Sequence, residues 1–169
     1  MNEVLNEERE TGRDSLGLSG EQKVVIHLDT GEIIKGRLRV NDHNGTPCFE
    51  DSLVDGSGAI SVKPLDASGP LAIQPQNVKA IFVVRSFQGD PKRKDLRFYG
   101  NGPAVGNTWV EVQFKDGEII EGFIENSVQH LLEAGFWLRP SDPRSNNTFI
   151  HVNKTAIVNF RVLGVKAAE

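Results

Sequence analysis

Residues 24–38 read VVIHLDTGEIIKGRL, and residues 110–124 read VEVQFKDGEIIEGFI. The shared pattern predicts that the chain is built from two copies of one unit. Two further matches extend the repeat: Lys63-Pro64-Leu65-Asp66 with Arg139-Pro140-Ser141-Asp142, and Asn77-x-x-Ala80-Ile81 with Asn153-x-x-Ala156-Ile157. The repeat indicates the fold and leaves the function open, because a small β-barrel needs these glycines and apolar positions whatever it binds.

Each copy begins with a predicted β-hairpin. Apolar and polar residues alternate over residues 24–29, which is the period of a half-buried strand. The turn is Thr-Gly at residues 30–31 and Asp-Gly at residues 116–117, and Asp-Gly is a strong hairpin signal because both residues tolerate positive φ. A second glycine follows inside each return strand, at Gly36 and Gly122, where we expect it to let the strand bend into a barrel.

Further strands are predicted at residues 59–63, 71–74 and 78–85 in the first copy, and at 135–139, 148–152 and 156–163 in the second. Short strands separated by turn signals are typical of small barrels, which leave few exposed sheet edges. We therefore expect an all-β protein of two tandem five-stranded barrels, residues 21–88 and 108–165. Residues 1–20 predict a disordered tail, and residues 89–107 predict a basic linker rich in Gly and Pro.

The order of strand, Asp-Gly turn, strand with an internal glycine and three further strands resembles SH3-like and Sm-like barrels. The segments FKDGEIIEGF (114–123), GFWLRPSDPRSNN (135–147) and IFVVRSFQGDP (81–91) resemble an uncharacterised bacterial domain family whose members often occur beside PilZ-type signalling domains. This resemblance implies a tandem of small barrels and a role in bacterial signalling or surface motility. It implies no known reaction or ligand.

Composition restricts the classes of function. The formal net charge of −4 disfavours a surface designed to hold nucleic acid. RNA binding of the Sm-like kind is therefore ranked as the second alternative function. Cys48 is the single cysteine, and the sequence shows no signal peptide or apolar run of transmembrane length, which predicts a cytoplasmic protein without membrane insertion. No metal or cofactor is expected, because the histidines are scattered: His27, His43, His130 and His151.

The chain shows no motif for catalysis. No Ser, Thr or Cys lies in a recognisable nucleophile motif, and the Gly-rich segments lack the Lys-Ser/Thr of a phosphate-binding loop. We therefore expect a non-enzymatic binding or adaptor module whose partner is a protein. An edge strand of either barrel could add to a partner's sheet or to a second copy of the chain, and the second case would be self-association.

A basic cluster in and before the predicted linker is the most suggestive ligand site. Arg85, Arg93 and Arg97 are interleaved with aromatic residues that include Tyr99, and such groups can hold a phosphate and stack on a base. Arg93 and Arg97 fit the RxxxR spacing with which PilZ domains bind cyclic di-GMP, although the usual companion motif Asp/Asn-x-Ser-x-x-Gly is absent. A cyclic di-GMP receptor is therefore the first alternative function, and a solvated linker is the competing interpretation.

The segment RPSDPRSNN, residues 139–147, is a second candidate site. Pro fixes backbone dihedrals and Asp and Asn side chains bond to nearby amides, which favours a self-stabilised turn. The functional alternative is a partner-binding rim, since loops on rigid barrels often carry binding residues. The side chains of such a rim are those of Arg139, Asp142, Arg144, Asn146 and Asn147.

Overall fold

The computed structural model describes residues 20–43, 46–49, 58–97 and 103–166. The first half contains β1 (Gly20–Leu28), β2 (Ile33–His43), β3 (Thr46–Cys48), β4 (Ile60–Pro64), β5 (Leu71–Ile73) and β6 (Val78–Val84). The second half contains β7 (Asn107–Phe114), β8 (Ile119–Glu125), β9 (Gly135–Pro140), β10 (Asn147–Asn153) and β11 (Ile157–Val165). A helical turn, α1 (Gln129–Leu132), precedes β9, and the 3-10 turns η2 (Pro75–Asn77) and η3 (Lys154–Ala156) precede β6 and β11. The predicted tail lies almost wholly outside the described residues.

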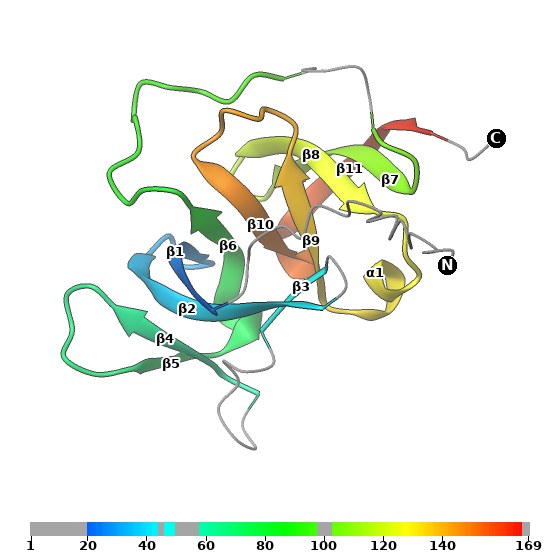
Figure 1. Cartoon of the computed structure of the whole chain (residues 1–169). Helices are drawn as coiled ribbons and strands as arrows, with labels where there is room; N and C mark the ends of the chain where they lie inside the picture. Colours follow the sequence, from blue (N-terminus) through cyan, green and yellow to red (C-terminus); the bar gives the residue numbers. More distant parts are fainter. Residues whose placement is uncertain (1–19, 44–45, 50–57, 98–102, 167–169) are drawn as a thin grey trace, which may run out of the picture.

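The described strands form one antiparallel sheet (Figure 1) in the order β11-β7-β8-β9-β10-β6-β1-β2-β4-β5, with β3 paired to β2. The prediction of an all-β protein is confirmed. The two tandem five-stranded barrels that were predicted are not closed, because β6 pairs with β1 through one edge and with β10 of the other half through its second edge. That second edge is therefore not used to close the first half, and the sheet stays open, with β11 and β5 at its ends.

The two halves share a pairing order, β6-β1-β2-β4-β5 in the first and β11-β7-β8-β9-β10 in the second. Gly36 lies opposite Pro64, and Gly122 lies opposite Pro140. The predicted match of Asn77 with Asn153 is out of register. Asn153 immediately precedes η3, and the residue that takes this place before η2 is Gln74 rather than Asn77.

Strand β6 lies between two apolar clusters. All seven of its side chains are buried. Because successive side chains of a strand point to opposite faces, Ile81 and Val83 join the first cluster, whereas Phe82 and Val84 join the second. The first cluster also includes Phe149 of β10, so the second half of the chain completes the core of the first.

A buried lysine on β6 adds a polar connection between the halves. Lys79 is 7% exposed, and its ammonium group contacts the carboxylates of Asp116 and Glu118 in the β7–β8 turn. The same ammonium group lies 4.5 Å from the ring centroid of Phe114. A buried charge requires such partners, so this contact ties the turn of the second hairpin to the central strand.

The glycines inside β2 and β8 are required by the close approach of the next strand. A Cβ atom at Gly36 would lie 2.5 Å from the carbonyl oxygen of Lys63, and one at Gly122 would lie closer still to that of Arg139. The neighbouring atoms are backbone atoms, which cannot move away cheaply. These positions therefore accept only glycine without a shift of β4 or β9.

Replacement of Gly122 by alanine should lower the free energy of unfolding by about 1–3 kcal/mol, the usual cost of overpacking. Urea denaturation measures this change. Gly69→Ala is the matched control, because a Cβ atom there would meet nothing within 4 Å. Equal stability of the two variants would contradict the close-approach explanation.

An aromatic cluster lies on the face of β9 and β10 that packs against the first apolar cluster. The ring of His151 lies 5.0 Å from that of Trp137 and 5.0 Å from that of Phe49, and Trp137 also contacts Phe149. Desolvation among these rings lowers the pKa of His151 to about 4. The imidazole is therefore neutral in the folded protein at neutral pH.

This pKa predicts acid sensitivity. Between the ordinary pKa of 6.5 and about 4, the unfolded state takes up a proton that folded His151 does not, so stability falls as the pH is lowered through this range. The expected loss from His151 is on the order of 2 kcal/mol. In His151→Gln the stability should vary less with pH over the same range in urea titrations, and an unchanged pH dependence would contradict the assignment.

Candidate binding surfaces

The predicted basic linker is docked on the loop between β9 and β10 (Figure 1). The Arg93 guanidinium donates a 2.6 Å hydrogen bond to Asp142 Oδ2, and the Leu96 amide donates to the same oxygen at 3.0 Å. The Arg144 amide donates to Asp142 Oδ1 at 2.9 Å. Burial by itself would raise the pKa of the Asp142 carboxyl, but the amides of Leu96 and Arg144 and the charge of Arg93 outweigh it and hold that pKa below its usual range.

A second set of hydrogen bonds joins the same two segments. Ser145 Oγ bonds to Asp95 Oδ2 at 2.5 Å, and Arg85 Nε donates to the Ser145 carbonyl at 3.2 Å. Asn146 accepts from the Ser86 amide at 3.1 Å and donates to the Ser86 carbonyl at 2.9 Å. The structure therefore brings together two groups of residues that the sequence analysis treated as separate sites.

The arginines of the RxxxR pair face carboxylates. Arg93 is bonded to Asp142, whose side chain is fully buried, and Arg97 lies 4.0 Å from Glu111 while remaining 46% exposed. Tyr99 lies outside the described residues. A phosphate at this position would have to compete with both carboxylates, so the visible role of Arg93 is to hold the linker on the loop.

A cleft of about 950 Å³ lies between the linker and strands β8 and β10. Its lining carries charges of both signs, and its cations are those of Arg93, Lys94 and Arg97. The acidic lining residues are Asp90, Asp95, Glu118 and Glu121. Because anion binding depends on a concentration of positive charge, this mixed lining does not favour a dinucleotide over a neutral or polar ligand.

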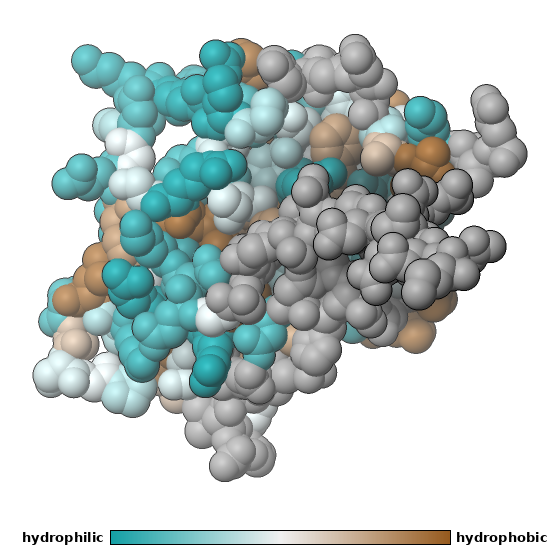
Figure 2. Space-filling model, in the orientation of Figure 1, coloured by the Kyte–Doolittle hydropathy of each residue, from teal (hydrophilic) through white to brown (hydrophobic). Residues whose placement is uncertain are grey.

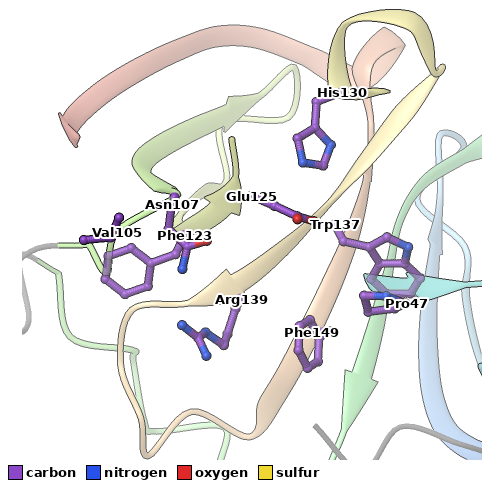
Figure 3. Close-up of a pocket in the computed structure, with 10 residues that line it drawn as sticks. Pro47, Val105, Asn107, Phe123, Glu125, His130, Trp137, Arg139 and Phe149 are labelled. Atoms are coloured by element: carbon purple, nitrogen blue, oxygen red, sulfur yellow. The ribbon is translucent and has the colours of Figure 1, made fainter. Parts of the chain in front are cut away.

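Among the predicted rim residues, Arg139 lies apart from Asp142. It lines a pocket of about 280 Å³ together with Phe123, Trp137 and Phe149. Figure 3 shows Arg139 between Phe123 and Phe149, with Glu125 and His130 farther along the pocket. Arg144 contributes its backbone amide to Asp142, and the Asn147 amide donates to Ser145 Oγ at 3.1 Å. The loop thus supports the prediction of a self-stabilised turn, and its role as a binding rim stays a prediction.

The sequence predicted that an edge strand could bind a partner, but it did not indicate that this strand is β11 or that its apolar face is exposed. This nine-residue strand ends the sheet, and no described strand pairs with its second edge. Val158 is 64% exposed, Phe160 41% and Val162 58%. The alternation of these residues with Asn159 and Arg161 is visible in the sequence, but their exposure depends on which strand covers them.

An apolar groove of about 800 Å³ runs beside β11. One wall is formed by Val158, Phe160 and Val162, and the other by Val128 and Leu131 at α1. At its base the Phe160 ring lies edge-on to Phe136 of the second apolar cluster, with 5.9 Å between ring centroids. The second cluster is therefore open toward solvent along β11.

The described part of the chain is thus an open antiparallel sheet with a polar linker docked on one loop and an apolar strand at one end. A family model matches residues 20–164, and the chain belongs to this family, DUF6982, which is a family of unknown function. The predicted membership of an uncharacterised family is confirmed. No curated protein and no solved structure matches the chain.

Within residues 20–43, 46–49, 58–97 and 103–166, no three His, Cys, Asp or Glu side chains group so as to hold a metal ion. None of the helices in these segments has the length and apolar composition needed to cross a membrane.

Asp142→Asn tests the docking of the linker. The loss of the carboxylate charge should weaken the contact with Arg93 and destabilise the protein by about 1–3 kcal/mol, the range for hydrogen bonds to charged groups. Hydrogen exchange should show faster exchange of the Leu96 amide. Asp66→Asn, at an exposed position, is the control. Unaltered exchange at Leu96 would show that Asp142 does not hold the linker.

Proposed function

We propose that this protein is a non-enzymatic binding module that accepts an extended segment of a protein partner as an additional strand on β11. The observation that carries the proposal is the unpaired edge of β11 in the described sheet, next to the groove formed with α1. In strand addition, backbone hydrogen bonds provide affinity and alternate side-chain pockets provide specificity. Both elements are present along β11.

The composition of β11 supports binding rather than protection of the edge. Natural sheets usually blunt an exposed edge with lysine, proline or a very short strand. Strand β11 has nine residues and neither lysine nor proline, and its register with β7 shifts twice, between Ile157 and Asn159 and between Val162 and Gly164. Its single charged residue, Arg161, bonds to Glu111 at 3.2 Å. The exposed apolar side chains of Val158, Phe160 and Val162 therefore lie beside a backbone that can pair with another strand.

The finer family assignment is part of this proposal. We treat each half as an SH3-like or Sm-like unit of a tandem, which the shared pairing order of the halves supports. The resemblance to domains found beside PilZ-type proteins then suggests an adaptor in bacterial signalling or motility, in the cytoplasm. Binding of cyclic di-GMP through Arg93 and Arg97 has less support, because both guanidinium groups face carboxylates.

A peptide selection tests the proposal. Random peptides displayed on phage are selected on the full chain, with Val162→Glu used for counter-selection, and enriched peptides are measured by fluorescence anisotropy. We expect peptides with alternating apolar residues, and at least about tenfold weaker binding to Val162→Glu because a charge would enter an apolar contact.

Ile33→Glu is the matched control, because Ile33 is 55% exposed and Val162 is 58% exposed, and Ile33 lies in β2, away from both ends of the sheet. It should retain full binding. Enrichment of peptides that bind Val162→Glu and the original chain equally would overturn the assignment of β11 as the binding edge.

A further inference from the structure

We propose that the strand bound by β11 is β5 of a second copy of this chain, so that copies assemble head to tail. This inference rests on the proposed function of the β11 edge and names its partner. It predicts that the joint between two copies repeats the joint that β6 and β10 make inside one chain.

The internal joint defines which edges are complementary. In the first half the terminal strands of the pairing order are β6 and β5, and in the second half they are β11 and β10. Strand β6 stands next to β1 as β11 stands next to β7, whereas β10 stands next to β9 as β5 stands next to β4. Pairing of β6 with β10 leaves β11 and β5 at the ends of the sheet. Strand β11 is the counterpart of β6, and β5 is the counterpart of β10.

The registers also define the expected contacts. Ile81 lies opposite Ile26, and its counterpart Phe160 lies opposite Val112, the residue that corresponds to Ile26 in the repeated hairpin. By the same comparison, His151 opposite Trp137 corresponds to Ala72 opposite Ser61.

The internal pair His151–Ile81 therefore translates into Ala72 opposite Phe160 of the neighbouring copy. Its neighbours, Ile150–Phe82 and Val152–Ala80, translate into Leu71 opposite Arg161 and Ile73 opposite Asn159.

Burial shows what the second copy would cover. In the internal joint, Ile81 is 0% exposed and Val83 is 1% exposed. Their counterparts at the free end, Phe160 and Val162, are 41% and 58% exposed. Leu71 of β5, at the other end of the sheet, is 42% exposed and would lie opposite Arg161, so the assembly would cover it on the face of the sheet opposite to Phe160 and Val162.

Figure 2 shows hydrophobic residues at the left edge of the molecule, over the β4–β5 hairpin, and at the right edge, near α1 and the end of β11. The two edges lie at opposite ends of the sheet, and β5 and β11 do not pair with each other within the chain. Strand β5 has three residues and β10 has seven, so the joint between copies is shorter than the internal one and its formation should depend on concentration. A contact between unlike edges produces a ring or a filament, not an isologous dimer.

Light scattering coupled to size exclusion, and sedimentation over a concentration series, test the assembly on the full chain. We expect a mass that rises with concentration above the 18.6 kDa of one chain. Val162→Glu on β11 and Ala72→Glu on β5 should each weaken association at least about tenfold, because each puts a charge into an apolar joint. Ile33→Glu should associate as the original chain does.

Mixing the two edge variants separates this assembly from other pairings. Val162→Glu retains an intact β5 and Ala72→Glu retains an intact β11, so the mixture should form a dimer of twice the chain mass. The double variant Ala72→Glu/Val162→Glu should stay monomeric and should not join either single variant. If two β11 strands paired with each other, Ala72→Glu would dimerise alone, and this result would overturn the head-to-tail joint.

The outcome is distinguishable from failure of the proposed function. A chain that stays monomeric at all concentrations but binds β11-selected peptides would refute the second copy as partner and leave the binding edge in place. A monomeric chain that selects no such peptide would refute both.

Discussion

The pairing of β6 on both of its edges is the interaction on which the rest of the structure depends. Its side chains alternate between two apolar clusters, and its backbone joins β1 of one half to β10 of the other. Neither half is large enough to bury a substantial core alone. Phe149 entering the first cluster and Lys79 contacting the second hairpin show that the halves stabilise each other.

The same joint explains why the sheet is open. A strand has two hydrogen-bonding edges, and once β10 occupies the second edge of β6, that edge cannot close the first half into a barrel. Among the described strands, the edges left without a partner are then those of β11 and β5, at the two ends of the sheet. An exposed edge favours association with another strand. The candidate function therefore follows from the way in which the core is completed, and not from a cluster of reactive side chains.

Local patterns in the sequence predicted the hairpins, the glycine positions and the all-β class, because strand period and turn chemistry act over a few residues. They could not predict the β6–β10 joint, since any apolar strand can pair with any other and the choice depends on the complete core. The match of Asn77 with Asn153 was wrong because the two residues hold different places in their turns: Asn77 is the last residue of η2, whereas Asn153 precedes η3. The contact of Arg93 with Asp142 was hidden because two charged loops far apart in the sequence give no sign that they meet.

For the linker and for β11, the appearance of the sequence differs from the role of the segment in the structure. The linker looks like a ligand site because its basic residues are dense, yet Arg93 is matched by Asp142 and Arg97 by Glu111. The buried carboxylate of Asp142 is kept charged by the Leu96 and Arg144 amides and by Arg93. Strand β11 looks like an ordinary core strand, yet Phe160 is exposed because nothing described occupies the position that β10 takes on β6. Charges that are paired within the chain are weak evidence for a binding site. A strand edge that no described strand pairs with, beside an apolar cluster open to solvent, is stronger evidence. Within the described sheet β11 leaves a backbone edge unpaired, and the natural complement of such an edge is another β-strand.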